Sequence, residues 1–274
     1  MIVAACNPAR GETHNFSHSR ENDLAKEWAS GHYQVSELPG SMTKLKWAYG
    51  SLESEQEKEF ILRRIENMKK FPPHLIRSLT ELVATSQEAI RSFAVDHFLK
   101  ISKGGSSNVV LEDDARQRAR STVSLRDIQR VFNLFHFFSY EFPITKCVGS
   151  DYDNQKYHHA MLLAISVVYY LRLDQDGRSK FLQTVENLPT EIRGEGLEDV
   201  LTTAMDSVMC ETEIPSGIAL TRGLKENVFM TLVCSLSRTP LMIVGPPGSS
   251  KVRVLFDMLL CVYICACVPI LNLA

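Results

Sequence analysis

The chain has 274 residues, 45% of them hydrophobic and 23% charged, which is ordinary for a folded globular chain and long enough for about two domains. Thirty basic residues against 32 acidic ones give a formal net charge of -2, so the whole chain carries no electrostatic footprint for nucleic acid, and we expect no such partner. The seven cysteines are scattered without a CxxC pair, which predicts a reducing, cytoplasmic location and excludes a zinc-binding domain in these residues.

The chain opens on a short apolar run, Ile2–Cys6, followed by Asn7 and Pro8. A proline cannot donate a ladder hydrogen bond, so we expect a buried strand that ends at Asn7. The polar stretch over residues 10–36 predicts loops with one short helix around residues 21–29.

Residues 53–70 have apolar side chains at helical spacing with charges between them, and the sequence Phe71-Pro72-Pro73 closes this predicted amphipathic helix. A second helix is expected over residues 74–101, ending before the glycine pair at 104–105. A third begins at Ser124, because Asp127 follows three residues later as in a capping box. A long apolar helix is expected over residues 158–171, followed by a turn at residues 174–177.

The last informative stretch predicts an amphipathic helix over residues 220–236 and an apolar strand over residues 240–244. A glycine-rich loop ending in a lysine follows at once, which is the order that a phosphate-binding loop requires. Backbone N–H groups of such a loop wrap the phosphates and the lysine neutralises them. The predicted phosphate-binding residues are Gly245, Pro246, Pro247, Gly248, Ser249, Ser250 and Lys251.

The loop departs twice from the strict phosphate-binding pattern. Ser250 replaces the glycine before the lysine, and Val252 replaces the Ser or Thr that would hold Mg²⁺, so the sequence does not supply that ligand. The alternative interpretation is a plain turn after a strand. The apolar strand that runs directly into Gly245, with a helix before it, favours a nucleotide loop.

The tail, residues 252–274, is apolar almost throughout. Its uncharged part, residues 258–274, is short for a bilayer span and contains Pro269, so we expect no membrane partner, although a tail anchor stays an alternative. A buried helix after a phosphate loop would instead be amphipathic. A further hypothesis is that Lys251-Val252-Arg253 marks a splice junction beyond which translation continues into an intron.

Four segments carry a resemblance to a known family. Residues 214–251, IPSGIALTRGLKENVFMTLVCSLSRTPLMIVGPPGSSK, closely resemble the start of a nucleotide-binding module in the mysterin family of AAA+ ATPases and RING-type ubiquitin ligases, whose phosphate loop also carries GSSK. The opening, IVAACNPARG, resembles the strand and Asn-Pro of the preceding module, and VSLRDIQRVFNLF resembles its lid helix, as in dynein and midasin machines. Residues 33–52 are similar too, so the resemblance covers about residues 1–251.

The resemblance implies two catalytic residues, Asn7 as the sensor-1 residue that polarises the attacking water and Arg126 as the sensor-2 arginine that reaches a phosphate. It implies ATP and Mg²⁺ as cofactors, with residues 245–251 binding the nucleotide. Neighbouring AAA+ modules are the implied partners, the ubiquitin machinery is reached only through domains outside these residues, and the implied location is cytoplasmic, including lipid droplets. Taken singly, Asn7 is typical of a strand-ending turn, and Arg126 of an exposed residue near a helix start.

The expected fold class is α/β and helix-rich: partial AAA+ (P-loop NTPase) modules, mostly a helical lid with isolated strands. The expected domains are the end of a large subdomain (1–52), a helical lid and linker (53–212), the start of the next module (213–251) and a divergent apolar tail (252–274). The expected function is a fragment of an AAA+ ATPase ubiquitin ligase that is inactive alone, because each nucleotide site lacks part of its groups. The alternatives are a non-catalytic helical interaction module and a tail-anchored membrane protein. No metal ligands are expected, since the histidines show no ligand spacing.

Overall fold

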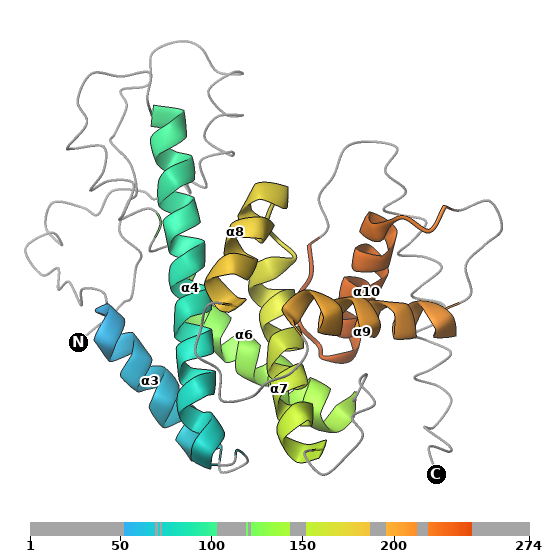
Figure 1. Ribbon diagram of the computed structural model, residues 1–274, viewed down its shortest axis with the longest axis horizontal. Coiled ribbons are helices and arrows are strands. Elements are labelled where there is room, and N and C mark those ends of the chain that lie inside the picture. Colours follow the sequence, from blue (N-terminus) through green and yellow to red (C-terminus); the bar gives the residue numbers. More distant parts are fainter. Residues whose placement is uncertain are drawn as a thin grey trace, which may run out of the picture. The chain divides into compact units, whose positions relative to one another are not determined.

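The computed structural model describes residues 52–68, 71, 73–102, 119, 122–142, 152–186, 196–212 and 219–242. The chain divides into a unit of residues 1–52 and a unit of residues 53–274, and the described helices all belong to the second unit (Figure 1). The helix-rich character predicted from the sequence is confirmed. In chain order these elements are α3 (Ser54–Asn67), α4 (Pro73–Ser102), α6 (Leu125–His136), η1 (Phe137–Glu141), α7 (Tyr152–Ile165), η2 (Ser166–Tyr170), α8 (Gln175–Glu186), α9 (Leu197–Glu211) and α10 (Arg222–Leu236).

Helices α3 and α4 pack against each other as the first pair of the helical unit. A capping box starts α3, in which the Glu53 backbone N–H donates to the Gln56 side chain over 3.1 Å. The predicted apolar face of α3 is confirmed at Ile61 and Ile65, which are fully buried, whereas Phe60 is 38% exposed. The turn between the two helices contributes the ring of Phe71, which stacks on a phenylalanine of α6, Phe135, at a centroid distance of 4.4 Å.

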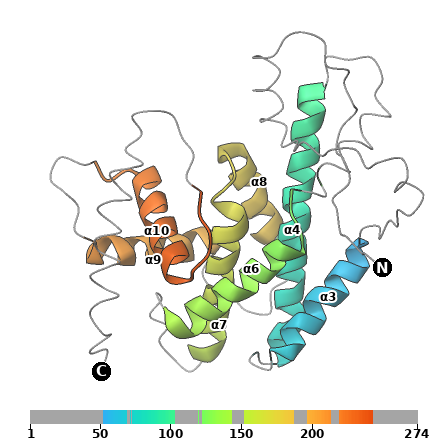
Figure 2. The same cartoon turned by 180° about the vertical axis from the view of Figure 1, so that it is seen from behind.

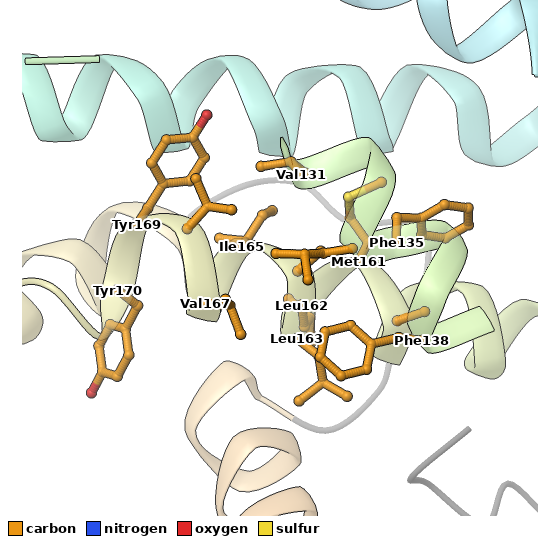
Figure 3. Packing of buried hydrophobic residues seen from close by; sticks show 14 of the residues in the cluster. Val131, Phe135, Phe138, Met161, Leu162, Leu163, Ile165, Val167, Tyr169 and Tyr170 are labelled. Carbon is orange, nitrogen blue, oxygen red and sulfur yellow. The ribbon is translucent and has the colours of Figure 1, made fainter. Parts of the chain in front are cut away.

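Helix α7 is the centre of this unit. It packs against α4, α6 and α9, and α6 runs beside it when the molecule is turned around (Figure 2). Every residue from His158 to Tyr170 is buried, as expected for a helix enclosed by others, and most of these residues are apolar. Figure 3 shows α7 and η2 side chains interleaved with those of α6 and η1, including Val131, Phe135 and Phe138.

Two of the helices end in a π-helical turn, η1 after α6 and η2 after α7. In η2 the Leu171 N–H donates to the Ser166 carbonyl, five residues earlier, over 2.9 Å. Ser166 is fully buried, and its hydroxyl donates to the Leu162 carbonyl over 2.8 Å. The same bond from a buried serine to the carbonyl four residues earlier occurs at Ser86 in α4, which stays a regular α-helix.

Helix α8 begins where the sequence predicts a turn. Asp174 precedes the helix, and its side chain accepts a hydrogen bond from the Gly177 N–H over 2.8 Å. The predicted turn at residues 174–177 is therefore the N-terminal cap of a helix, because an aspartate before the first turn satisfies the free N–H groups there. A side chain at Gly177 would lie 2.8 Å from the Asp174 carboxylate oxygen, so a larger residue there would displace this capping carboxylate.

The predicted strands are not among the described elements. Residues 2–6 lie outside the described residues, as do residues 243 and 244 of the second predicted strand. Leu241 and Met242 are described, have no regular secondary structure, and Met242 is 86% exposed. Within the described ranges no helix is both long and apolar enough to cross a membrane.

Candidate functional site

Arg126, the predicted sensor-2 arginine, is exposed in the first turn of α6. The Ser124 hydroxyl accepts a hydrogen bond from the Arg126 N–H over 3.3 Å, and the Asp127 carboxylate accepts one from the Ser124 N–H over 2.8 Å. The predicted capping box is therefore present. Within the described part of the chain, no hydrogen bond or ion pair holds the Arg126 guanidinium.

A cation is unfavourable at a helix N-terminus, because the helix dipole is positive there. Arg126 therefore does not stabilise its own helix, and its charge remains available to an anion. Asp127, by contrast, is buried and accepts a hydrogen bond from Arg130 over 2.9 Å. The first turn of α6 thus contains one carboxylate held in place and one arginine that points into solvent.

The other predicted site residues lie outside the described residues: Asn7, Gly245, Pro246, Pro247, Gly248, Ser249, Ser250 and Lys251. The nucleotide site formed by these residues therefore stays a prediction. What the structure does describe is how the lid-like helices are joined to α10, the helix that precedes the glycine-rich loop.

A buried polar network joins α3, α4 and η2 through Glu57, Gln87, Arg91 and Tyr169. The Arg91 guanidinium donates to both carboxylate oxygens of Glu57, over 2.5 and 2.8 Å. The Gln87 amide donates to Glu57 over 2.5 Å, and the Tyr169 hydroxyl donates to the Gln87 carbonyl oxygen over 2.8 Å. Gln87 and Tyr169 are fully buried and Glu57 is 7% exposed, so the network lies inside the helical unit.

Electrostatics fix the protonation of the buried polar network. Burial raises the pKa of Tyr169 above its ordinary range, with the charge of Asp127 adding to the effect, so the phenol stays a hydrogen-bond donor. Burial by itself lowers the pKa of Arg91. The hydrogen bond to Glu57 and the charge of that carboxylate raise this pKa by more, so the net pKa is raised. The network is therefore a fixed ion pair extended by two neutral groups.

A second set of contacts, which we call the charge network, joins η2, α8, α9 and α10 through Tyr170, Arg178, Glu198, Arg222 and Glu226. Arg178 of α8 donates to both carboxylate oxygens of Glu226 in α10, over 2.6 and 2.9 Å. Arg222 donates to Glu226 over 3.0 Å and also to Glu198 of α9. The Tyr170 hydroxyl donates to the other oxygen of Glu198 over 2.6 Å, and the Arg178 guanidinium lies over the Tyr170 ring at 5.3 Å.

Arg178 is the most firmly held member of the charge network. Besides its ion pair, it donates to the backbone carbonyls of Leu173 and Leu171 over 3.0 and 3.1 Å. Burial raises the pKa of Glu226, but the hydrogen bonds and charges of Arg178 and Arg222 outweigh burial and hold the pKa below its ordinary value. The carboxylate therefore stays ionised at neutral pH and fastens α10 to α8.

The histidines of α7 are buried rather than arranged around an ion. Within the described ranges no group of three or more His, Cys, Asp or Glu side chains could hold a metal. Burial lowers the pKa of His158 from 6.5 to about 4, with a smaller contribution from the neighbouring His159. His158 is thus a neutral core residue at physiological pH.

Comparison with known proteins gives a match in the C-terminal part of the chain. The family model described as "RNF213 AAA domain" matches residues 217–259, which begin just before α10 and include the predicted phosphate loop. The match continues past Lys251 to Leu259, into the segment that the sequence analysis places in a divergent tail. Residues 217–259 are therefore similar to an AAA-type domain.

Relatives extend the similarity along the chain. E3 ubiquitin-protein ligase rnf213-beta of Danio rerio is 28% identical over 91% of this chain, and RNF213 of Homo sapiens is also 28% identical over 91%. A protein of Dictyostelium discoideum named as a putative uncharacterized transmembrane protein is 27% identical over 80%. The chain is therefore similar to RNF213-type, or mysterin-type, proteins over most of its length. It spans only 4 to 5% of the length of these relatives.

Sequence reasoning missed both polar networks. Their partners are far apart in the sequence, 82 residues between Tyr169 and Gln87 and 48 between Arg178 and Glu226, so no local pattern joins them. One signal was present: Tyr169 and Tyr170 end a mostly apolar run and must place their hydroxyl groups against polar partners. The sequence gives no way to choose those partners.

Proposed function

We propose that the chain forms part of the ATP-handling core of a mysterin-type AAA+ protein. In this proposal residues 53–212 are a helical lid that follows one nucleotide site, and residues 213–251 begin the next module. The observation that carries the proposal is the RNF213 AAA-domain match, which covers α10 and the glycine-rich loop together. The charge network supports it further, because it attaches that helix to α8 and α9.

The proposed roles follow from phosphoryl-transfer chemistry, which depends on positioning and on neutralising the phosphate charge. Residues 245–251 would wrap the phosphates of ATP, with Lys251 as their counter-charge. Arg126 would extend from the lid helix to a phosphate of the preceding site, and Asn7 would orient the attacking water there. Val252 offers Mg²⁺ no ligand, so the metal would be held by the nucleotide and by groups other than residue 252.

We further propose that these residues carry no ubiquitin chemistry of their own. The relatives are named as E3 ubiquitin-protein ligases, but the cysteines of this chain lack the spacing of a zinc-binding ligase domain. The expected partners are neighbouring AAA+ modules, and the expected location is the cytoplasm. Residues 1–274 would provide some groups of two nucleotide sites and complete neither.

Equilibrium binding of a fluorescent ATP analogue tests the proposal, using the chain extended past Lys251 through the rest of its AAA-type region. Lys251→Ala should weaken binding by about tenfold or more, because it removes the main counter-charge. Lys180→Ala, which removes an exposed lysine of α8, is the matched control and should leave binding unchanged. Absence of binding in the extended chain would favour a non-catalytic helical module instead.

A tail-anchored protein is the second candidate, favoured by the name of the Dictyostelium relative. Carbonate extraction of membranes from cells that express the chain separates the two. The ATP-handling proposal expects the chain in the extracted fraction, and a tail anchor would retain it in the membrane pellet.

A further inference from the structure

The π-helical turn η2 is the place where the two polar networks meet. Tyr169 and Tyr170 are consecutive residues of this turn, yet their hydroxyl groups bond to different helices, Tyr169 to Gln87 of α4 and Tyr170 to Glu198 of α9. Figure 3 shows the two rings extending in opposite directions from the turn, with Tyr169 toward α4. The two hydroxyl groups are therefore positioned by one short piece of backbone.

The widened geometry of η2 decides where both rings point. A π-turn holds one residue more than an α-turn, so side chains at its end are rotated by up to about 100° from their α-helical directions. Both tyrosines are at most 2% exposed, and rings of this size cannot turn inside a close-packed core without displacing their neighbours. A change in the turn would therefore break both hydrogen bonds together.

We propose that η2 couples the two networks, so that the pairing of α3 with α4 and the attachment of α10 to α8 and α9 depend on each other. The buried polar network holds Tyr169, and through the backbone of η2 it holds Tyr170. Tyr170 in turn positions Glu198, which shares Arg222 with Glu226. Tyr169 and Tyr170 are positioning residues in this arrangement, and the coupling needs no bound nucleotide.

Native-state hydrogen exchange of the 274-residue chain tests the coupling. Tyr169→Phe removes one hydroxyl that faces α4 and leaves the ring in place. Coupling predicts that amides of α10 exchange faster by roughly fivefold or more in this variant, although α10 does not contact the deleted oxygen. The matched control is Ile61→Val, a fully buried residue of α3 outside both networks, which should leave the exchange of α10 unchanged.

The reciprocal variant, Tyr170→Phe, tests whether a change in the charge network affects α3 and α4. Tyr170→Phe should speed the exchange of amides in α3 and α4, and it keeps the test decisive if Tyr169→Phe fails to fold. In the double variant, α10 should exchange about as fast as in Tyr170→Phe alone, because one coupled element is already broken. Effects confined to α3 and α4 for Tyr169→Phe and to α9 and α10 for Tyr170→Phe would overturn the proposal.

Discussion

The two polar networks both join helices through ion pairs, but they differ in how far these pairs are exposed to solvent. The buried polar network combines one ion pair with two neutral groups, and its Arg91 and Glu57 side chains are 17% and 10% exposed. The charge network contains two arginines and two carboxylates, and its outer pair, Arg222 and Glu198, is 53% and 30% exposed. An enclosed ion pair is costly to break and is little screened by salt, whereas an open one contributes less and is screened. The outer pair of the charge network should therefore be lost more easily than the Arg91–Glu57 pair, whereas its inner pair, Arg178 and Glu226, is nearly as enclosed, at 20% and 14% exposed.

Glu57→Ala should produce the largest loss of stability. It leaves the Gln87 amide without its acceptor in the core and the Arg91 guanidinium with only the more exposed Glu88 carboxylate, 3.5 Å away, and breaking a buried pair costs about 3 to 5 kcal/mol. Urea unfolding followed by circular dichroism measures the change. The matched control is Glu59→Ala on the same helix, whose partner Arg63 is 72% exposed, and it should cost well under about 1 kcal/mol. Equal losses in the two variants would contradict the contrast between enclosed and open pairs.

Lowering the pH should reduce the stability of the fold through His158, a buried residue of α7 that belongs to neither network. Its pKa is about 4 in the fold and 6.5 when exposed, so the unfolded chain binds the proton more strongly. Stability is therefore unaffected above about pH 6.5 and falls as the pH drops toward 4, by at most about 3 kcal/mol.

Thermal unfolding between pH 7 and pH 4.5 tests this slope. His158→Leu should flatten it, because no imidazole then has to be charged on unfolding. His74→Gln, at an exposed position of α4, is the control and should keep the slope of the unmodified chain. An unchanged slope in His158→Leu would mean that other groups cause the acid sensitivity.

Glu226→Ala should have an intermediate effect of about 2 kcal/mol, smaller than that of Glu57→Ala. The reason is that Arg178 keeps its hydrogen bonds to the carbonyls of Leu171 and Leu173 after the carboxylate is lost. Hydrogen exchange should report the loss mainly in α10. A loss as large as that of Glu57→Ala would show that the charge network is as enclosed in solution as the first network.

Arg222→Ala should have the smallest effect, about 0.5 to 1 kcal/mol at low ionic strength. Because its pair with Glu198 is open to solvent, the effect should largely disappear in 1 M salt, where charges are screened beyond about 3 Å. Urea unfolding at two salt concentrations measures this. The effect of Glu57→Ala should hardly change between the same two conditions, which makes it the internal control.

Local rules predicted much of the fold. The capping box at Ser124 and Asp127 marks the start of α6, and the apolar spacing of Ile61 and Ile65 identifies the buried face of α3. The start of α8 was missed because Asp174 and Gly177 fit both a turn and a helix cap, and only the hydrogen bond between them decides. The π-turns were missed because a hydrogen bond across five residues, such as the one that Leu171 donates to Ser166, leaves no mark in the apolar spacing.

For the candidate site, the sequence predicted which residues take part but not how they are arranged in space. The role of Arg126 is implied by the resemblance of residues 123–135 to a lid helix, and the structure adds that its guanidinium is exposed and unpaired within the described residues. Its reach toward a phosphate depends on how the lid meets a nucleotide, which the sequence does not contain. The attachment of α10 depends on pairs far apart in the sequence and emerged only from the fold.

The most direct test of the central proposal is ATP turnover measured for two chains, residues 1–274 alone and the chain extended through the rest of its AAA-type region. The account predicts hydrolysis by the extended chain that Lys251→Ala reduces, and no hydrolysis by the 274 residues above the level of their own Lys251→Ala variant. Turnover by residues 1–274 that Lys251→Ala abolishes would contradict it.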